Sequence, residues 1–187
     1  HALECFISKK ANPFSDTFAL RGIRLISRSI LKAYHEGSDI QARHDMLLGS
    51  MFGGISIVTS GTTAIHALAY PLGGKFRIPH GVSNAMLLPH VMEFNLDAVE
   101  ERFSIVATEM GLNVNGMSAK EAAQKVLESI FMLVRDLNIP SDLRQYGILD
   151  EHLDTMAEEA SKVTRLLDNN PKKLSKEDMR AIYKKLL

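Results

Sequence analysis

Apolar residues recur at helical spacing along almost the whole chain, and this periodicity constrains the fold more than any other feature. Between residues 18 and 36 Arg and Lys separate the members of one apolar stripe, which are Phe18, Leu20, Ile23, Leu25, Ile26, Ile30 and Leu31. A stripe with a repeat of three to four residues is typical of an amphipathic helix. No segment alternates polar and apolar residues convincingly enough for a strand. The sequence therefore predicts an all-α fold, a multi-helix bundle.

Start and stop signals divide this pattern into separate helices. Asn12 and Pro13 precede the first long helix, and Gly37 follows it. Ser175 is placed to cap the last helix, with acidic residues in its first turn. Further helices are expected at 40–58, 62–70, 82–94, 97–110, 118–137, 150–166 and 175–186.

The helix expected at 40–58 is unusually rich in small residues. They are Gly49, Ser50, Gly53, Gly54 and Ser56. Glycines lower helix propensity, so the close approach of a neighbouring backbone or of a ligand is expected to compensate for them.

The stretch AIHALAYPLGGKFRIPHGVSNAMLLPH interrupts the helical pattern and contains three histidines. His66 and Tyr70 are four residues apart and share one helix face. Pro71 and Gly73 are expected to end this helix, and His80 is expected at or just before the start of the next. Two imidazoles could thus converge, and imidazole is a common metal ligand and proton carrier. From spacing alone, hydrogen-bonded core histidines remain the alternative, because the spacing is far looser than that of a zinc finger.

The remaining histidines are expected to be structural or solvated. His35, His44 and His152 lie among charged residues, as on a solvated helix face. His90 follows Pro89 inside an amphipathic helix and is interpreted as structural.

Composition excludes several classes of partner. The chain has 187 residues, of which 45% are hydrophobic, enough for the core of a large domain. Twenty-two basic residues balance 22 acidic ones, so we expect neither a nucleic-acid nor a membrane partner. Cys5 is the only cysteine, and no apolar run approaches the roughly 20 residues of a membrane span. A cytoplasmic protein is therefore expected; its first residue is His rather than Met, which suggests a fragment of a longer protein.

Three motifs resemble the iron-containing alcohol dehydrogenase family. HALAYPLGGKFRIPHGVSNAMLLPHVMEFN is similar to the family segment that joins two metal-binding histidines through P-L-G and P-H-G. The opening HALECFISKKANPFSD resembles the family's D-A-x-x-H-A-x-E followed by S-x-x-A-N-P-x-x-D, and LLDNNPKKLSKEDMRAIY resembles its closing N-N-P-R-x-x-[ST]-x-x-D. The resemblance covers nearly the whole chain. It implies that residues 1–187 form the helical, dehydroquinate synthase-like C-terminal domain of that family.

The resemblance also implies a metal site. His1, His66 and His80 would supply three imidazoles to Fe²⁺, and Zn²⁺ could replace iron because imidazole-rich sites suit both ions. The family's fourth ligand is an Asp four residues before the first of these histidines, a position that would precede residue 1.

Further residues are implied to lie along the cleft for nicotinamide and substrate. Gly53, Gly54 and Ile57 would line it, although simple helix packing explains them equally well. Lys75 and Phe76 could also face the cleft. Where many relatives carry a second His thought to assist proton transfer, this chain has Tyr70, a candidate proton relay or pocket wall.

The family's N-terminal half, a Rossmann-like α/β domain that binds NAD(P), is expected to lie outside this chain. No G-x-G-x-x-G or G-G-G-S stretch occurs here. The implied function is NAD(P)-linked interconversion of a small alcohol with an aldehyde or ketone, in which the metal polarises the substrate oxygen. It would belong to a longer, homodimeric enzyme, with the fragment alone inactive.

Two alternatives stay open. One is a zinc-dependent relative of the glycerol dehydrogenase or dehydroquinate synthase type, although those relatives lack the P-L-G-x5-P-H-G string. The other is a standalone helical module that binds a metal or a partner without catalysis.

Overall fold

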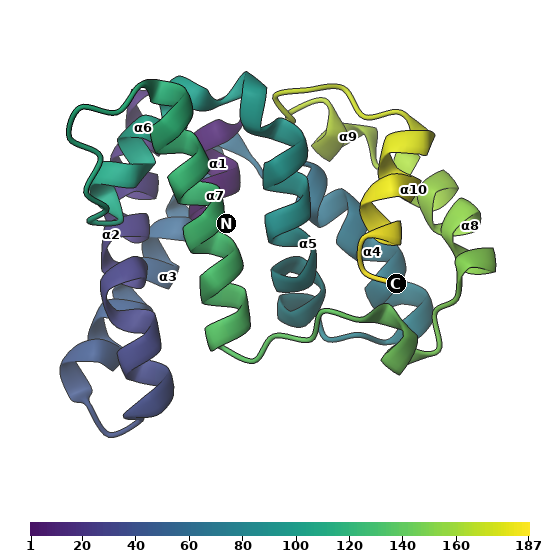
Figure 1. Cartoon of the computed structure of the whole chain (residues 1–187), viewed down its shortest axis with the longest axis horizontal. Helices are drawn as coiled ribbons and strands as arrows, with labels where there is room; N and C mark the ends of the chain where they lie inside the picture. The colour runs from purple at the N-terminus through teal and green to yellow at the C-terminus, as the bar shows by residue number, and fades with distance from the viewer.

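Helices form all of the regular structure, as predicted (Figure 1). The computed structural model describes every residue from His1 to Leu187 and contains no strand. The α-helices are α1 (Ala2–Ile7), α2 (Pro13–His35), α3 (Ile40–Ser60), α4 (Ala64–Phe76), α5 (His80–Asn95), α6 (Glu100–Glu109), α7 (Ala119–Asp136), α8 (Asp150–Ser161), α9 (Thr164–Leu167) and α10 (Lys176–Lys184). Two 3₁₀ helices, η1 (Leu96–Ala98) and η2 (Leu143–Tyr146), complete the bundle.

The two longest helices, α2 and α3, pack side by side and project from one end of the molecule (Figure 1). Asn12 caps α2 by accepting hydrogen bonds from two backbone N–H groups of its first turn. Two glycines explain the close packing: a Cβ atom on Gly22 would lie 3.2 Å from the carbonyl oxygen of Gly49, and one on Gly49 would lie 2.7 Å from Cγ1 of Ile26. Gly49, one of the small residues of α3, therefore serves the packing of α3 against α2.

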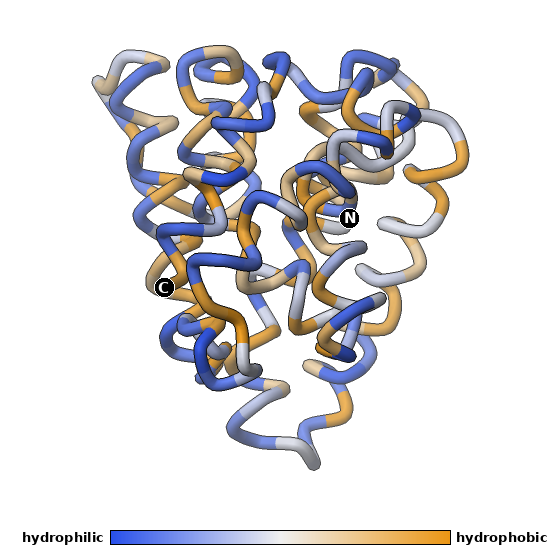
Figure 2. Tube along the Cα trace, turned by 90° about the vertical axis from the view of Figure 1, so that its right-hand side faces the viewer, coloured by the Kyte–Doolittle hydropathy of each residue, from blue (hydrophilic) through white to orange (hydrophobic).

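Helix α4 lies at the centre of the core. Its residues from Ala64 to Ala69 are all buried, and it packs against α5 and α8. The buried Tyr183 of α10 donates a hydrogen bond to the carbonyl oxygen of Leu68 at 2.6 Å. Elsewhere orange and blue segments follow each other along the helices (Figure 2), as expected where each helix buries one face.

The prediction that Pro71 and Gly73 end this helix is wrong, because α4 continues to Phe76. Proline removes one backbone hydrogen bond and crowds the preceding turn. Here Pro71 is itself buried, as is Leu72 after it, and this packing outweighs the lost bond. The helix ends instead where Arg77 adopts a left-handed conformation, with φ of 55°.

Two other predicted helices are divided in the structure. The segment 97–110 begins as η1 and continues as α6, and the segment 150–166 breaks between α8 and α9. No Gly or Pro marks the second break, which redirects the chain at Lys162 and Val163.

This redirection brings two buried asparagines to the loop between α3 and α4. The side-chain amide of Asn169 donates to the carbonyl oxygen of Thr62 at 3.0 Å. Asn170 exchanges two hydrogen bonds with Asn95 of α5, at 3.0 and 2.8 Å. Because α4 starts directly after this loop, the asparagines fix the position of the helix that carries His66.

No single helix has the length and apolar composition to cross a membrane; α3 and α4 pass that test only as a pair, bent by 107°.

Candidate metal centre

Three histidines from separate helices converge at one place. His1 precedes α1, His66 lies in the first turn of α4, and His80 is the first residue of α5. One ring nitrogen from each can be chosen so that all three lie within 4.8 Å of one another. The Nε2 atoms of His1 and His66 are 3.0 Å apart. The ring centroid of His66 is 4.8 Å from that of His1 and 5.2 Å from that of His80.

The cluster has a buried side and an open side. His66 is 7% exposed, whereas His1 and His80 are exposed. Solvent or a small ligand can therefore approach the ring nitrogens from the side of the two exposed histidines, while the rigid core of α4 holds the third.

A buried carboxylate contacts His66. Glu4 of α1 is only 2% exposed, and one of its oxygens, Oε2, makes a short contact with Nδ1 of His66. The other oxygen accepts hydrogen bonds from the backbone N–H and the hydroxyl of Thr63, both at 2.9 Å. Burial by itself would raise the pKa of the Glu4 carboxyl, but the bond to His66 and these further interactions bring the pKa below its ordinary value. Glu4 is therefore ionised at neutral pH.

His80 has no such partner. Its closest polar neighbour is Asn84, one turn along α5, whose side-chain amide donates to the carbonyl oxygen of His80 at 2.8 Å. The same amide nitrogen lies 3.2 Å from both ring nitrogens of His80. An exposed ring without a carboxylate is held less firmly than that of His66.

The short helix α1, which follows His1, is fastened to the rest of the molecule. A helix of six residues is not stable by itself. The guanidinium of Arg102 donates to the backbone carbonyl oxygen of Phe6 at 2.5 Å. The same guanidinium lies over the aromatic ring of Phe6, 3.8 Å from its centre. Beyond the helix, Ser8 donates to the carbonyl oxygen of Ser60 at 2.7 Å.

The glycine-rich part of α3 meets the histidine cluster at one position. A Cβ atom on Gly53 would lie 3.4 Å from Cβ of His1, so this glycine packs directly against the first histidine. Gly54 faces open space, and Ile57 is half-buried one turn later.

Three other residues named from the sequence lie outside the cluster. Tyr70 is 44% exposed and makes no side-chain hydrogen bond within the chain. Lys75 pairs with Glu159 at 2.7 Å, and the ring of Phe76 packs edge-on against His152. Lys75 and Phe76 thus contact α8.

The remaining histidines take no part in the cluster. His35 and His44 are exposed, as expected. His152 is half-buried rather than solvated, and its Nδ1 accepts a hydrogen bond from the backbone N–H of Leu149 at 2.9 Å. His90 packs against the ring of Phe131, and burial lowers its pKa.

The three imidazoles fit a divalent transition metal. Nitrogens that share one ion at about 2.0–2.2 Å lie about 3 to 4 Å apart, and the pair formed by His1 and His66 already meets this spacing. The bond between Glu4 and Nδ1 of His66 leaves Nε2 of that ring available, and this atom faces Nε2 of His1. Histidine with a carboxylate on its second nitrogen is the usual arrangement of a metal-binding histidine.

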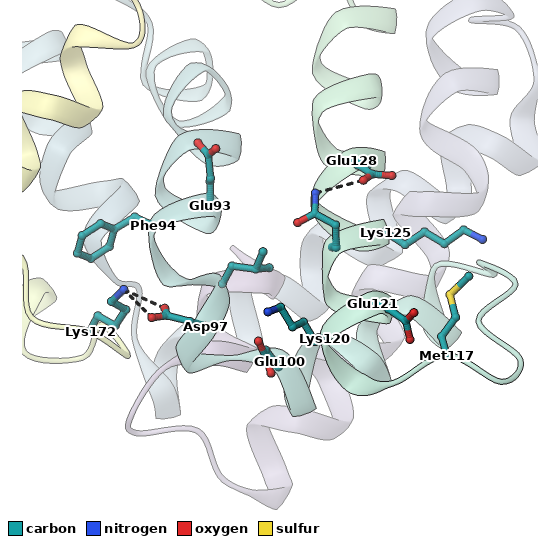
Figure 3. A pocket seen from close by; sticks show the side chains of 12 residues that line it. Glu93, Phe94, Asp97, Glu100, Met117, Lys120, Glu121, Lys125, Glu128 and Lys172 are labelled. Carbon is teal, nitrogen blue, oxygen red and sulfur yellow. Dashed lines mark hydrogen bonds and ion pairs between the residues drawn. The ribbon is translucent and has the colours of Figure 1, made fainter.

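A separate groove of about 800 Å³ lies between the end of α5, η1 and α7 (Figure 3). None of the three histidines lines it. Its walls carry charges of both signs, some of them already paired, as between Lys172 and Asp97 at 2.8 Å. The groove therefore contributes nothing to the candidate metal centre.

Sequence reasoning gave no role to Glu4. A signal was present, since an acidic residue three positions after His1 shares its helix face. Its partner is 62 residues away, so only the tertiary structure shows what the carboxylate contacts.

Residues 1–187 match a protein-family model described as the Fe-containing alcohol dehydrogenase family, C-terminal. The long-chain-alcohol dehydrogenase 1 of Geobacillus thermodenitrificans is 42% identical over 98% of this chain and 46% of its own length. The 1,3-propanediol dehydrogenase of Klebsiella pneumoniae is 40% identical over 98% of this chain and 47% of its own length.

Among solved structures, a 1,3-propanediol oxidoreductase superposes on the whole chain with a TM-score of 0.96 at 40% identity, and the chain covers 49% of it. The chain thus spans about half the length of the relatives that it matches.

Proposed function

Because this chain belongs to the iron-containing alcohol dehydrogenase family, with the fold of its C-terminal domain, we propose that it is the metal-binding half of an NAD(P)-linked alcohol dehydrogenase. His1, His66 and His80 hold Fe²⁺, or Zn²⁺ in its place. The nicotinamide coenzyme is held mainly by a part of the full-length protein beyond these residues. The substrate is a small alcohol, or the matching aldehyde or ketone.

The convergence of the three imidazoles carries this proposal. Their ring nitrogens come from helices that begin at residues 2, 64 and 80, yet they lie within 4.8 Å of one another. Histidines without a common ligand would not be expected to converge in this way. Nor would the buried one, His66, be expected to have a carboxylate, that of Glu4, on its second ring nitrogen. A divalent ion bound there supplies Lewis-acid polarisation of the substrate oxygen.

The protein residues have distinct tasks at this centre. His66, buried and tied to Glu4, sets the position of the ligand sphere. The exposed side, between His1 and His80, admits the substrate. Gly53 leaves room for His1 where a larger residue would displace it. Tyr70 is a candidate proton relay, because its phenol is exposed one turn from His66 and makes no hydrogen bond to another group of the chain.

Metal binding by the purified chain tests this proposal. Zn²⁺ affinity is measured by competition with a chelator for the wild type, His66→Ala and His80→Ala, with His35→Ala as the control because His35 lies outside the cluster. One ion per chain is expected, with affinity lowered at least about tenfold by either cluster variant and unchanged by the control. Equal affinities in all four proteins would overturn the metal site.

The same substitutions in the full-length protein test the chemistry. Alcohol oxidation with NAD⁺ or NADP⁺ should be lost in His66→Ala and retained in His35→Ala, and metal analysis of the wild type decides between iron and zinc. Full activity of His66→Ala would show that the histidine centre has no part in the reaction.

A further inference from the structure

We propose that Glu4 is a positioning residue for His66. Its carboxylate holds the imidazole in the tautomer that carries its proton on Nδ1, so that the lone pair of Nε2 points toward His1 and His80. The inference rests on the proposed function only in taking Nε2 as the atom that binds the metal.

The contacts of Glu4 leave its carboxylate one orientation. Oε1 faces two donors of Thr63, the backbone N–H and the hydroxyl, each at 2.9 Å, and the backbone N–H of His66 at 3.4 Å. Oε2 faces Nδ1 of His66 alone. An ionised carboxylate only accepts hydrogen bonds, so Nδ1 must be the donor in this pair.

These contacts also connect two helices of the centre. Thr63 precedes α4 and gives that helix no cap from its own side chain. The acceptor at this helix start comes instead from Glu4 of α1. The six-residue helix α1 thus follows His1 and carries Glu4, whose carboxylate orients His66. The register of α1 therefore fixes His1 and His66 together.

The same donors determine what an amide would do at this position. In Glu4→Gln the carbonyl oxygen must stay beside Thr63, because placing the NH₂ group there would set donor against donor. The NH₂ group then faces Nδ1 of His66, which must become an acceptor. The proton moves to Nε2, the nitrogen that faces His1. A substitution of nearly equal size is thus expected to reverse the tautomer.

Nitrogen-15 NMR of the metal-free chain tests this directly, in the pH range in which the imidazoles are neutral. The His66 ring is assigned by its loss in His66→Ala. The proton is expected on Nδ1 in the wild type and on Nε2 in Glu4→Gln. A wild-type ring that carries its proton on Nε2, or an identical tautomer in both proteins, would overturn the proposal.

Zn²⁺ affinity of the same proteins gives the second measurement. Glu4→Gln is expected to bind about 10–100-fold more weakly than the wild type. Asp45→Asn is the matched control: Asp45 is buried to a similar extent, at 3% exposure, but contacts Arg28 and Ser29 rather than any of the three histidines of the cluster. It should lower stability and leave both the tautomer and the affinity unchanged.

The two measurements separate this inference from the proposed function. If the wild type binds Zn²⁺ and Glu4→Gln binds it equally well, the metal site stands and the positioning role fails. If the wild type binds no Zn²⁺, the proposed function fails, and the tautomers of the metal-free proteins still decide the role of Glu4.

Discussion

Besides Glu4, the fold buries one other acidic side chain, that of Asp45 near the turn between α2 and α3. Its Oδ2 accepts hydrogen bonds from the hydroxyl of Ser29 at 2.7 Å and from Arg28 at 2.5 Å, and its Oδ1 accepts one from Gln41. These bonds hold the pKa of the Asp45 carboxyl well below its usual range, and the bond from Ser29 has the largest effect. The ionised side chain ties the two long helices together.

The substitution Asp45→Asn should lower the free energy of unfolding at pH 7. Because the folded-state pKa is depressed, the contribution of the carboxylate is complete above its unfolded pKa of about 3.9 and is lost as pH falls toward the lower folded value. Urea unfolding of both proteins at pH 7 and pH 3 measures this, and the difference between them should shrink at pH 3. Asp168→Asn serves as control, since Asp168 is exposed and accepts no side-chain hydrogen bond.

Two glycines of α3, five residues apart, have opposite surroundings. A Cβ atom on Gly49 would lie 2.7 Å from Cγ1 of Ile26, inside the contact of α2 and α3, whereas one on Gly54 would meet no atom within 4 Å. Alanine stabilises a helix interior by up to about 1 kcal/mol relative to glycine where nothing opposes it. The surroundings of each glycine therefore decide whether its replacement by alanine raises or lowers the free energy of unfolding.

We expect Gly54→Ala to raise the free energy of unfolding by up to about 1 kcal/mol. Gly49→Ala should lower it by about 1–3 kcal/mol, because the added methyl group overpacks the helix contact. Denaturant unfolding of the two variants measures both effects. Equal changes in the two variants would mean that α2 and α3 do not approach as closely as the structure shows.

The helices could be predicted where their signals are local. Ser175 was expected to cap the last helix and does so, because its hydroxyl accepts a hydrogen bond from the N–H of Asp178. The continuation of α4 through Pro71 could not be predicted, because it depends on the buried packing around that proline. The break at Lys162 likewise depends on distant contacts of the asparagines that follow it.

The candidate site likewise contains residues that the sequence could predict and residues that it could not. Spacing and helix ends indicated that His66 and His80 could converge, and the structure brings them together. His1 was implied only by the family resemblance, since its approach depends on how α1 packs against α2 and α3. Glu4 required the structure, because its partner lies in another helix.

At the scale of the whole molecule, the bundle brings distant segments to one centre. The N-terminal helix supplies Glu4, the central helix α4 supplies His66, and the asparagines after α9 hold the loop from which α4 starts. None of these segments is stable by itself at this length, so the geometry of the histidines belongs to the packed bundle.

The coordination of a bound ion tests the central claim, that the three histidines form one metal site. Zinc K-edge X-ray absorption of the chain loaded with one equivalent of Zn²⁺ counts the imidazole ligands and measures their distances. We expect three imidazole nitrogens at about 2.0–2.1 Å, and one fewer in His66→Ala. A spectrum that shows only oxygen ligands or a single imidazole, or that is unchanged in His66→Ala, would contradict the claim.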